Sequence, residues 1–88
     1  MQKDTRTIQV TQEHIAKGER CDGDFCPIAW AMMDALGGHW TVHETWAESV
    51  EKEYRRCSLP ESAADFISSF DGGAMVFPFE FDCVIEGS

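Results

Sequence analysis

The segment Met75-Val-Phe-Pro-Phe-Glu-Phe-Asp-Cys-Val-Ile85 decides the fold, because apolar and polar residues alternate along most of its length. Such alternation is typical of a β-strand with one face on a core, so it predicts a strand over 75–85. The inward face would carry Phe77, Phe79, Phe81, Cys83 and Ile85. Pro78 has no backbone N–H, so the strand either lies at a sheet edge or begins its pairing after the proline.

Three helices are predicted before this strand. Residues 27–36 are apolar nearly all round, which predicts a buried central helix that ends at the glycine pair 37–38. Residues 60–70 have apolar side chains at helical spacing, and Ser58 with Glu61 has the pattern of a capping box. A short helix over 12–17 follows Thr11 as N-cap, and we expect its His14 to be solvated.

Further strands are predicted from weaker alternation over 7–10 and 39–46, where Trp40, Val42 and Trp46 would share a face. Residues 47–57 fit either a helix or a strand, and a hairpin with 39–46 favours the strand. The elements predict one α+β domain over 1–88, with a small antiparallel sheet of three to four short strands and two to three helices packed on it.

The charges are strongly unbalanced, with 16 Asp and Glu against 7 Lys and Arg. Residues 21–51 and 57–88 each contain six acids and no base. A surface of this sign repels nucleic acid and attracts basic partners. The partner-binding residues predicted from these base-free stretches are Asp22, Asp24, Glu44, Glu48, Asp65 and Asp71. The alternative is that the acids serve only solubility.

Composition restricts where the protein works. The longest apolar run is about ten residues, which is too short to span a bilayer. The N-terminal residues have no apolar stretch behind them, so we expect no signal peptide and a cytoplasmic protein. In that compartment the four cysteines are expected as free thiols or metal ligands, and Cys57 as an ordinary semi-buried cysteine.

One motif suggests metal chemistry. Cys21, Cys26, His39 and His43 have the spacing C-x4-C-x12-H-x3-H, which falls inside the spacing of a zinc finger. Both histidines of a finger belong on one helix, yet here they follow two glycines in a segment that alternates like a strand. Four residues along a strand span about 13 Å, too far for one zinc ion. We therefore predict no metal and no cofactor, and keep a zinc-stabilised domain that uses Cys21, Cys26 and one histidine as an alternative.

Several short sequence pieces recur together in a known group of proteins. They are Val10-Thr11 with His14-Ile15 and Gly18, Cys26-Pro27-Ile28-Ala29 with Ala31, Leu59-Pro60, Phe66-Ile67 with Phe70-Asp71, and Val76 with Pro78-Phe79 and Phe81. On these residues the chain resembles a group of small acidic proteins encoded by phages and prophages. The resemblance covers roughly residues 8–82 and leaves out Cys21, His39 and His43. It implies a phage context and a small α+β fold, and it transfers no active site.

The leading functional hypothesis is a non-enzymatic phage protein that works in the host cytoplasm. It would inhibit a host nucleic-acid-binding or defence complex in the manner of an anti-CRISPR protein, because an acidic face can occupy a groove that otherwise holds phosphates. Its partner would be a basic host protein, without direct contact to nucleic acid or membrane. The second hypothesis is a structural or assembly module that forms a small homo-oligomer such as a homodimer. An enzyme is not expected, since the sequence contains no nucleophile–base pattern and no phosphate loop.

Overall fold

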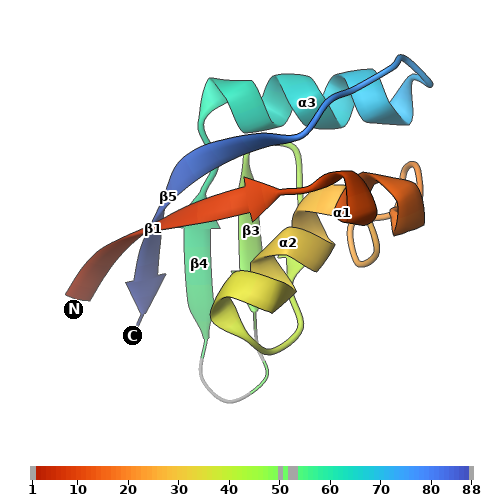
Figure 1. Cartoon of the computed structure of the whole chain (residues 1–88). Helices are drawn as coiled ribbons and strands as arrows, with labels where there is room; N and C mark the ends of the chain where they lie inside the picture. Colours follow the sequence, from red (N-terminus) through yellow and green to blue (C-terminus); the bar gives the residue numbers. More distant parts are fainter. Residues whose placement is uncertain (1, 50, 52–53, 88) are drawn as a thin grey trace.

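A five-stranded antiparallel sheet and three helices make up residues 2–49, 51 and 54–87, the part of the chain that the computed structural model describes (Figure 1). In chain order the elements are β1 (Gln2–Val10), α1 (Gln12–Lys17), α2 (Pro27–Leu36), β2 (Thr41–Val42), β3 (Trp46–Ser49), β4 (Arg55–Ser58), α3 (Glu61–Asp71) and β5 (Phe79–Gly87). The strand order is β1-β5-β4-β3-β2, with every neighbouring pair antiparallel. The α+β class is confirmed, and the sheet has more strands than the three to four predicted.

The C-terminal strand lies inside the sheet and pairs with β1 on one side and β4 on the other. Its ladder begins at Phe79, directly after the proline, so pairing after Pro78 is the correct one of the two predicted arrangements. The alternation continues from there, with Phe81, Cys83 and Ile85 buried. The predicted inward position of Phe77 is wrong: its side chain is 68% exposed, because the chain before Pro78 is not part of the sheet.

One face of the sheet is covered by helices. Helix α2 lies across it and contacts both edge strands, β1 and β2 (Figure 1). Ile28, Ala29 and Met32 of α2 are buried, as its apolar sequence predicts. Helix α3 adds Ala63 and Phe66 to the same core. The other sheet face has exposed polar residues, so the two faces differ as expected for an antiparallel sheet.

Some predicted boundaries and contacts need correction. The strand predicted over 7–10 begins at Gln2, because its polar first half pairs with the end of β5. The strand predicted over 39–46 is only Thr41–Val42. A turn follows, closed by the His43 N–H, which donates to the Trp46 carbonyl at 2.7 Å. Trp46 therefore starts β3 on the face opposite to Val42, which pairs with Ala47.

The ambiguous segment 47–57 contributes to two strands, β3 and β4, so the preference for strand over helix is correct, but the described residues 51 and 54 belong to neither strand. Val50 and Lys52 lie outside the described residues. The predicted capping box of Ser58 and Glu61 is wrong. Ser58 ends β4 and pairs with β3 and β5, so the N-cap of α3 is Pro60, without a side-chain cap.

The start of α1 has a capping box that the sequence did not predict. Thr11 is the N-cap, as expected, and its N–H donates to Nδ1 of His14 at 3.0 Å. The expected exposure of His14 is wrong, because only 5% of this residue is accessible. Its Nε2 lies 2.6 Å from Oδ2 of Asp34, so the ring joins α1 to α2.

Candidate functional site

A cleft opens between the loop after α1, the β2–β3 turn and helix α3. Its volume is about 470 Å³, and its walls come from residues 21–23, residues 42–46 and the α3 residues Ile67 and Asp71. A second hollow of about 430 Å³ shares Glu44, Thr45, Ile67 and Asp71, and continues along α3 past Ala64 and Ser68. The two hollows share these walls, and we call them together the acidic cleft.

Three of the six predicted partner-binding residues, Asp22, Glu44 and Asp71, line the acidic cleft. They come from three segments that are far apart in the sequence, so only the fold brings them together. No Lys or Arg is among the described residues that line it. The Arg20 guanidinium lies beside Gly73, just beyond the end of α3. The cleft is therefore a concave surface of negative charge.

Backbone hydrogen bonds hold the loop wall of the cleft in place. The Cys21 N–H donates to Oδ1 of Asp71 at 2.8 Å, and the Asp24 N–H donates to Oδ1 of Asp22 at 2.9 Å. The Val42 N–H donates to the Gly23 carbonyl at 2.8 Å, which fastens the loop to β2. A Cβ on Gly23 would lie 2.5 Å from the Val42 oxygen, so glycine permits this close approach. The wall is thus preorganised by the chain itself.

The turn wall is equally well fixed. The His43–Trp46 bond closes the turn, and the Leu59 N–H donates to the Thr45 carbonyl at 2.9 Å. Glu44 lies exposed in the middle of this turn. No ion pair with another described residue is formed by any of the three cleft acids, Asp22, Glu44 and Asp71. Their charges are available to a partner.

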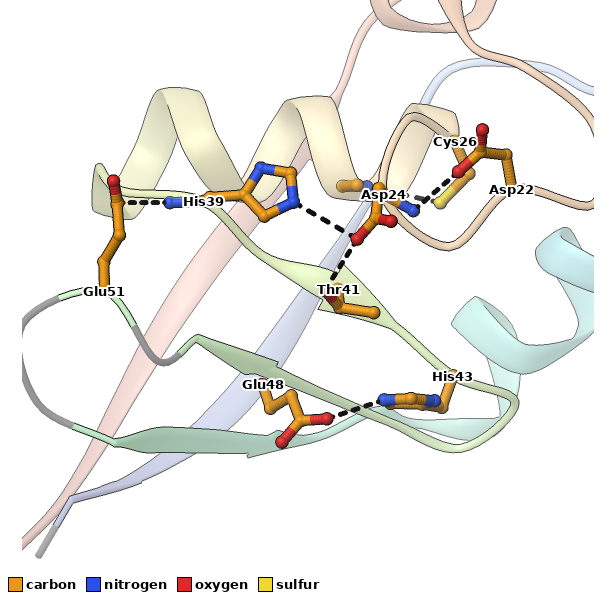
Figure 2. Close-up of polar contacts among 9 residues, drawn as sticks. Asp22, Asp24, Cys26, His39, Thr41, His43, Glu48 and Glu51 are labelled. Carbon is orange, nitrogen blue, oxygen red and sulfur yellow. Dashed lines mark hydrogen bonds and ion pairs between the residues drawn. The ribbon is translucent and has the colours of Figure 1, made fainter.

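Asp24 and Glu48, also predicted, belong to a neighbouring cluster in which each carboxylate already faces a histidine (Figure 2). Oδ1 of Asp24 accepts a bond from the Thr41 hydroxyl at 2.7 Å and lies 3.2 Å from His39 Nε2. The hydrogen bond from Thr41, followed by that with His39, lowers the pKa of Asp24. This carboxylate is therefore ionised but partnered.

Glu48 also has partners. Its Oε2 lies 3.0 Å from His43 Nε2 (Figure 2), and its cross-strand neighbour is Arg56. Both of these neighbours contact Trp46: the His43 ring stacks on it with the ring centres 4.1 Å apart, and the Arg56 guanidinium is 4.2 Å from the centre of the Trp46 ring. These contacts form a self-contained cluster on the open sheet face. We therefore leave Glu48 out of the site.

The sixth predicted acid, Asp65, is exposed on α3 but does not line the cleft. Conversely, the apolar lining residues Val42 and Ile67 were not predicted as site residues, since nothing in their sequence distinguishes a cleft wall from a core position. Sequence reasoning could select acids in base-free stretches. It could not determine which of them face one another.

The cysteine–histidine pattern is not assembled into a metal site. No group of three or more metal-ligating side chains lies together among residues 2–49, 51 and 54–87. Cys26 is the N-cap of α2, where its Sγ accepts the Ala29 N–H at 3.4 Å, and burial raises its thiol pKa. The two histidines face Asp24 and Glu48 instead.

The remaining cysteines are free, and Cys57 and Cys83 are fully buried on the covered face of the sheet. The pKa of Cys57 is raised, because its thiol is hydrogen-bonded to Cys83 and because it is buried. Cys57 is thus more buried than the semi-buried residue predicted, and the neighbouring arginines do not lower its pKa.

Comparison with known proteins gives no match: no protein-family model, no curated protein and no solved structure is similar to this chain. No helix among the described residues has the length and apolar character needed to cross a membrane. The geometry and charge of the acidic cleft are therefore the features that bear on function.

Proposed function

We propose that the protein is a non-enzymatic, phage-encoded inhibitor whose acidic cleft binds a basic segment of a host nucleic-acid-binding or defence complex. The observation that carries this proposal is the meeting of Asp22, Glu44 and Asp71 in one cleft that is lined by no Lys or Arg of the described part of the chain. The resemblance to phage proteins supports a partner in the host cytoplasm. Surfaces that normally bind phosphates offer the complementary charge.

The lining of the cleft suits lysine and arginine side chains. Val42 and Ile67 offer apolar surface to the aliphatic stem of such a side chain, while the carboxylates at the rim receive its charged end. Arginine can form bidentate hydrogen bonds with a carboxylate, which adds geometric selectivity. A loop or helix that projects one or two such residues is the partner segment that this cleft fits best.

Binding there would exclude nucleic acid from the partner. The protein has a net charge of −9, so long-range attraction would speed its encounter with a basic surface. The fixed walls of the cleft reduce the entropy that binding must overcome, because little of the backbone has to be ordered. The inhibitor would therefore compete with phosphates for the same basic groups.

The test is a capture experiment from host lysate followed by displacement of nucleic acid. The wild-type protein should retain a basic complex at about 0.1 M salt, where the Debye length is about 10 Å, and release the oligonucleotide bound to it. The triple variant D22N/E44Q/D71N keeps the acceptor oxygens of the two aspartates but removes three charges. It should lose both effects.

The matched control is E13Q/D65N/E80Q, which removes three exposed charges outside the cleft. It should capture and displace nearly as well as the wild type. Equal loss in both variants would show that net charge alone is responsible and would contradict a role for the cleft.

A further inference from the structure

The two edges of the sheet differ in a way that points to a second binding surface. Edge strand β2 has only two residues, and its Val42 N–H is already bonded to the Gly23 carbonyl. Edge strand β1 has nine residues and, among the strands that the structure describes, pairs only with β5 (Figure 1). About half of its backbone N–H and C=O groups therefore point away from the sheet. A long edge of this kind is a template for another strand.

The charges on β1 indicate which strand fits. Asp4 and Arg6 lie on the same face of the strand and form an ion pair within the chain at 3.6 Å, with their side chains 64% and 50% exposed. They belong to the polar first half of β1, while Ile8 and Val10 in the second half are buried in the core. Charged residues on an edge normally discourage pairing. Asp4 and Arg6 have opposite signs, so β1 of one copy can complement β1 of a second copy in antiparallel orientation.

We propose that two copies of the chain associate through β1, antiparallel and centred on Thr5, to form a continuous ten-stranded sheet. When two strands are related by a two-fold axis, the residue on the axis lies opposite the same residue of the other strand. Thr5 therefore faces Thr5 of the second copy. Asp4 then faces Arg6 of the second copy in addition to Arg6 of its own strand, and the symmetry produces this cross-strand pair twice. Threonine pairs and opposite charges across strands are both favourable.

The neighbouring registers match the charges less well. Centring the pair on Asp4 or on Arg6 would place like charges face to face, which is destabilising. Centring it on Thr7 would place Asp4 opposite Val10 and Arg6 opposite Ile8, so that neither charge meets an opposite charge of the second copy. Of these four registers, the one centred on Thr5 is the one in which both charges face an opposite charge.

This dimer would leave the acidic cleft free. The cleft adjoins the β2–β3 turn, at the edge of the sheet opposite to β1. Each dimer would therefore present two clefts, but the association does not depend on what the clefts bind. The net charge of −9 on each copy opposes dimer formation, and added salt should weaken this repulsion.

Charge exchange at the interface tests the proposal by sedimentation equilibrium over a range of protein concentrations at about 0.15 M salt. The wild type should show a monomer–dimer equilibrium. D4R and R6D each place like charges opposite one another twice, and each should weaken the dimer by about tenfold or more. The double variant D4R/R6D restores opposite charges in the same register and should recover most of the association.

Two controls separate this effect from net charge and from misfolding. D65R and R20D change the net charge by the same amounts as the single variants, at exposed positions outside β1, and should leave the dimer nearly unchanged. Circular dichroism and thermal unfolding should be alike in all variants, since Asp4 and Arg6 are exposed. Amide exchange on the outer edge of β1 should slow as the protein concentration rises.

A wild type that stays monomeric up to millimolar concentration would overturn the proposal. So would a dimer that neither single charge reversal weakens, or one that the double variant fails to restore while remaining folded.

Discussion

Replacement of His14 should reveal how much stability one buried imidazole provides to the packing of α1 on α2. Nδ1 accepts the Thr11 N–H at 3.0 Å, so the proton of the neutral ring is on Nε2, which donates to Asp34 at 2.6 Å. In His14→Ala the Thr11 N–H loses its partner and the carboxylate loses its donor. The ring, 5% exposed, also leaves a gap in the packing.

The expected loss follows from these three contributions. The capping bond contributes about 1 kcal/mol. The bond to Asp34 contributes about 1 kcal/mol, below the usual range for a charged acceptor because solvent screens a carboxylate that is 61% exposed. Lost packing adds about 1 kcal/mol. His14→Ala should therefore lower the free energy of unfolding by about 3 kcal/mol and the melting temperature by about 15 °C.

Urea unfolding followed by tryptophan fluorescence measures this loss, since Trp40 is fully buried. His14→Gln keeps a capping acceptor at the same position but cannot reach Asp34, so it should lose only about 1–2 kcal/mol. A His14→Ala protein within about 0.5 kcal/mol of wild type would refute the reasoning. A glutamine variant as unstable as the alanine variant would refute the capping part of it.

Three further predictions concern other parts of the chain. Gly18→Ala should destabilise by about 1–3 kcal/mol in urea unfolding, because its Cβ would lie 2.5 Å from the Pro27 ring and 2.7 Å from the Pro27 nitrogen; unchanged stability would contradict this contact. Thr41→Val should raise the pKa of Asp24 toward its ordinary value in a carboxyl NMR titration. Since folding lowers this pKa, the stabilisation is present above the ordinary pKa of the group and is lost as the pH falls through the folded-state pKa; a pKa that does not respond would contradict the role of Thr41. In the native protein a thiol reagent should modify Cys21 quickly and the three buried cysteines only on unfolding, as mass spectrometry can show; rapid modification of all four would contradict their burial.

Local patterns in the sequence predicted the elements whose determinants are local. Helix α2 has the predicted bounds, since Pro27 and Gly37 define its ends and its sequence is apolar throughout. Helix α1 also has the predicted bounds. Strand β1 was predicted too short, because the polar residues of its first half gain their strand conformation from pairing with β5, 75 or more residues away in sequence. Such pairing leaves no apolar periodicity in the strand itself.

The candidate site was predictable only in part, for a similar reason. The base-free stretches identified Asp22, Glu44 and Asp71, but identified Asp24, Glu48 and Asp65 equally well. Tertiary structure separates the two sets: Asp24 and Glu48 face histidines, and Asp65 lies outside the cleft. His14 was misjudged because a short helix with several polar residues does not show which of them packs against a later helix.

The acidic cleft can be tested most directly with an arginine-rich peptide that carries a fluorescent label. Anisotropy titrations compare the wild type, the cleft variant D22N/E44Q/D71N and the control variant E13Q/D65N/E80Q at equal ionic strength. We expect the cleft variant to bind about tenfold or more weakly than the control, since three charge contacts of up to about 1 kcal/mol each are lost. Equal affinities for the two variants would contradict the claim that the cleft, and not the overall charge, receives a basic partner.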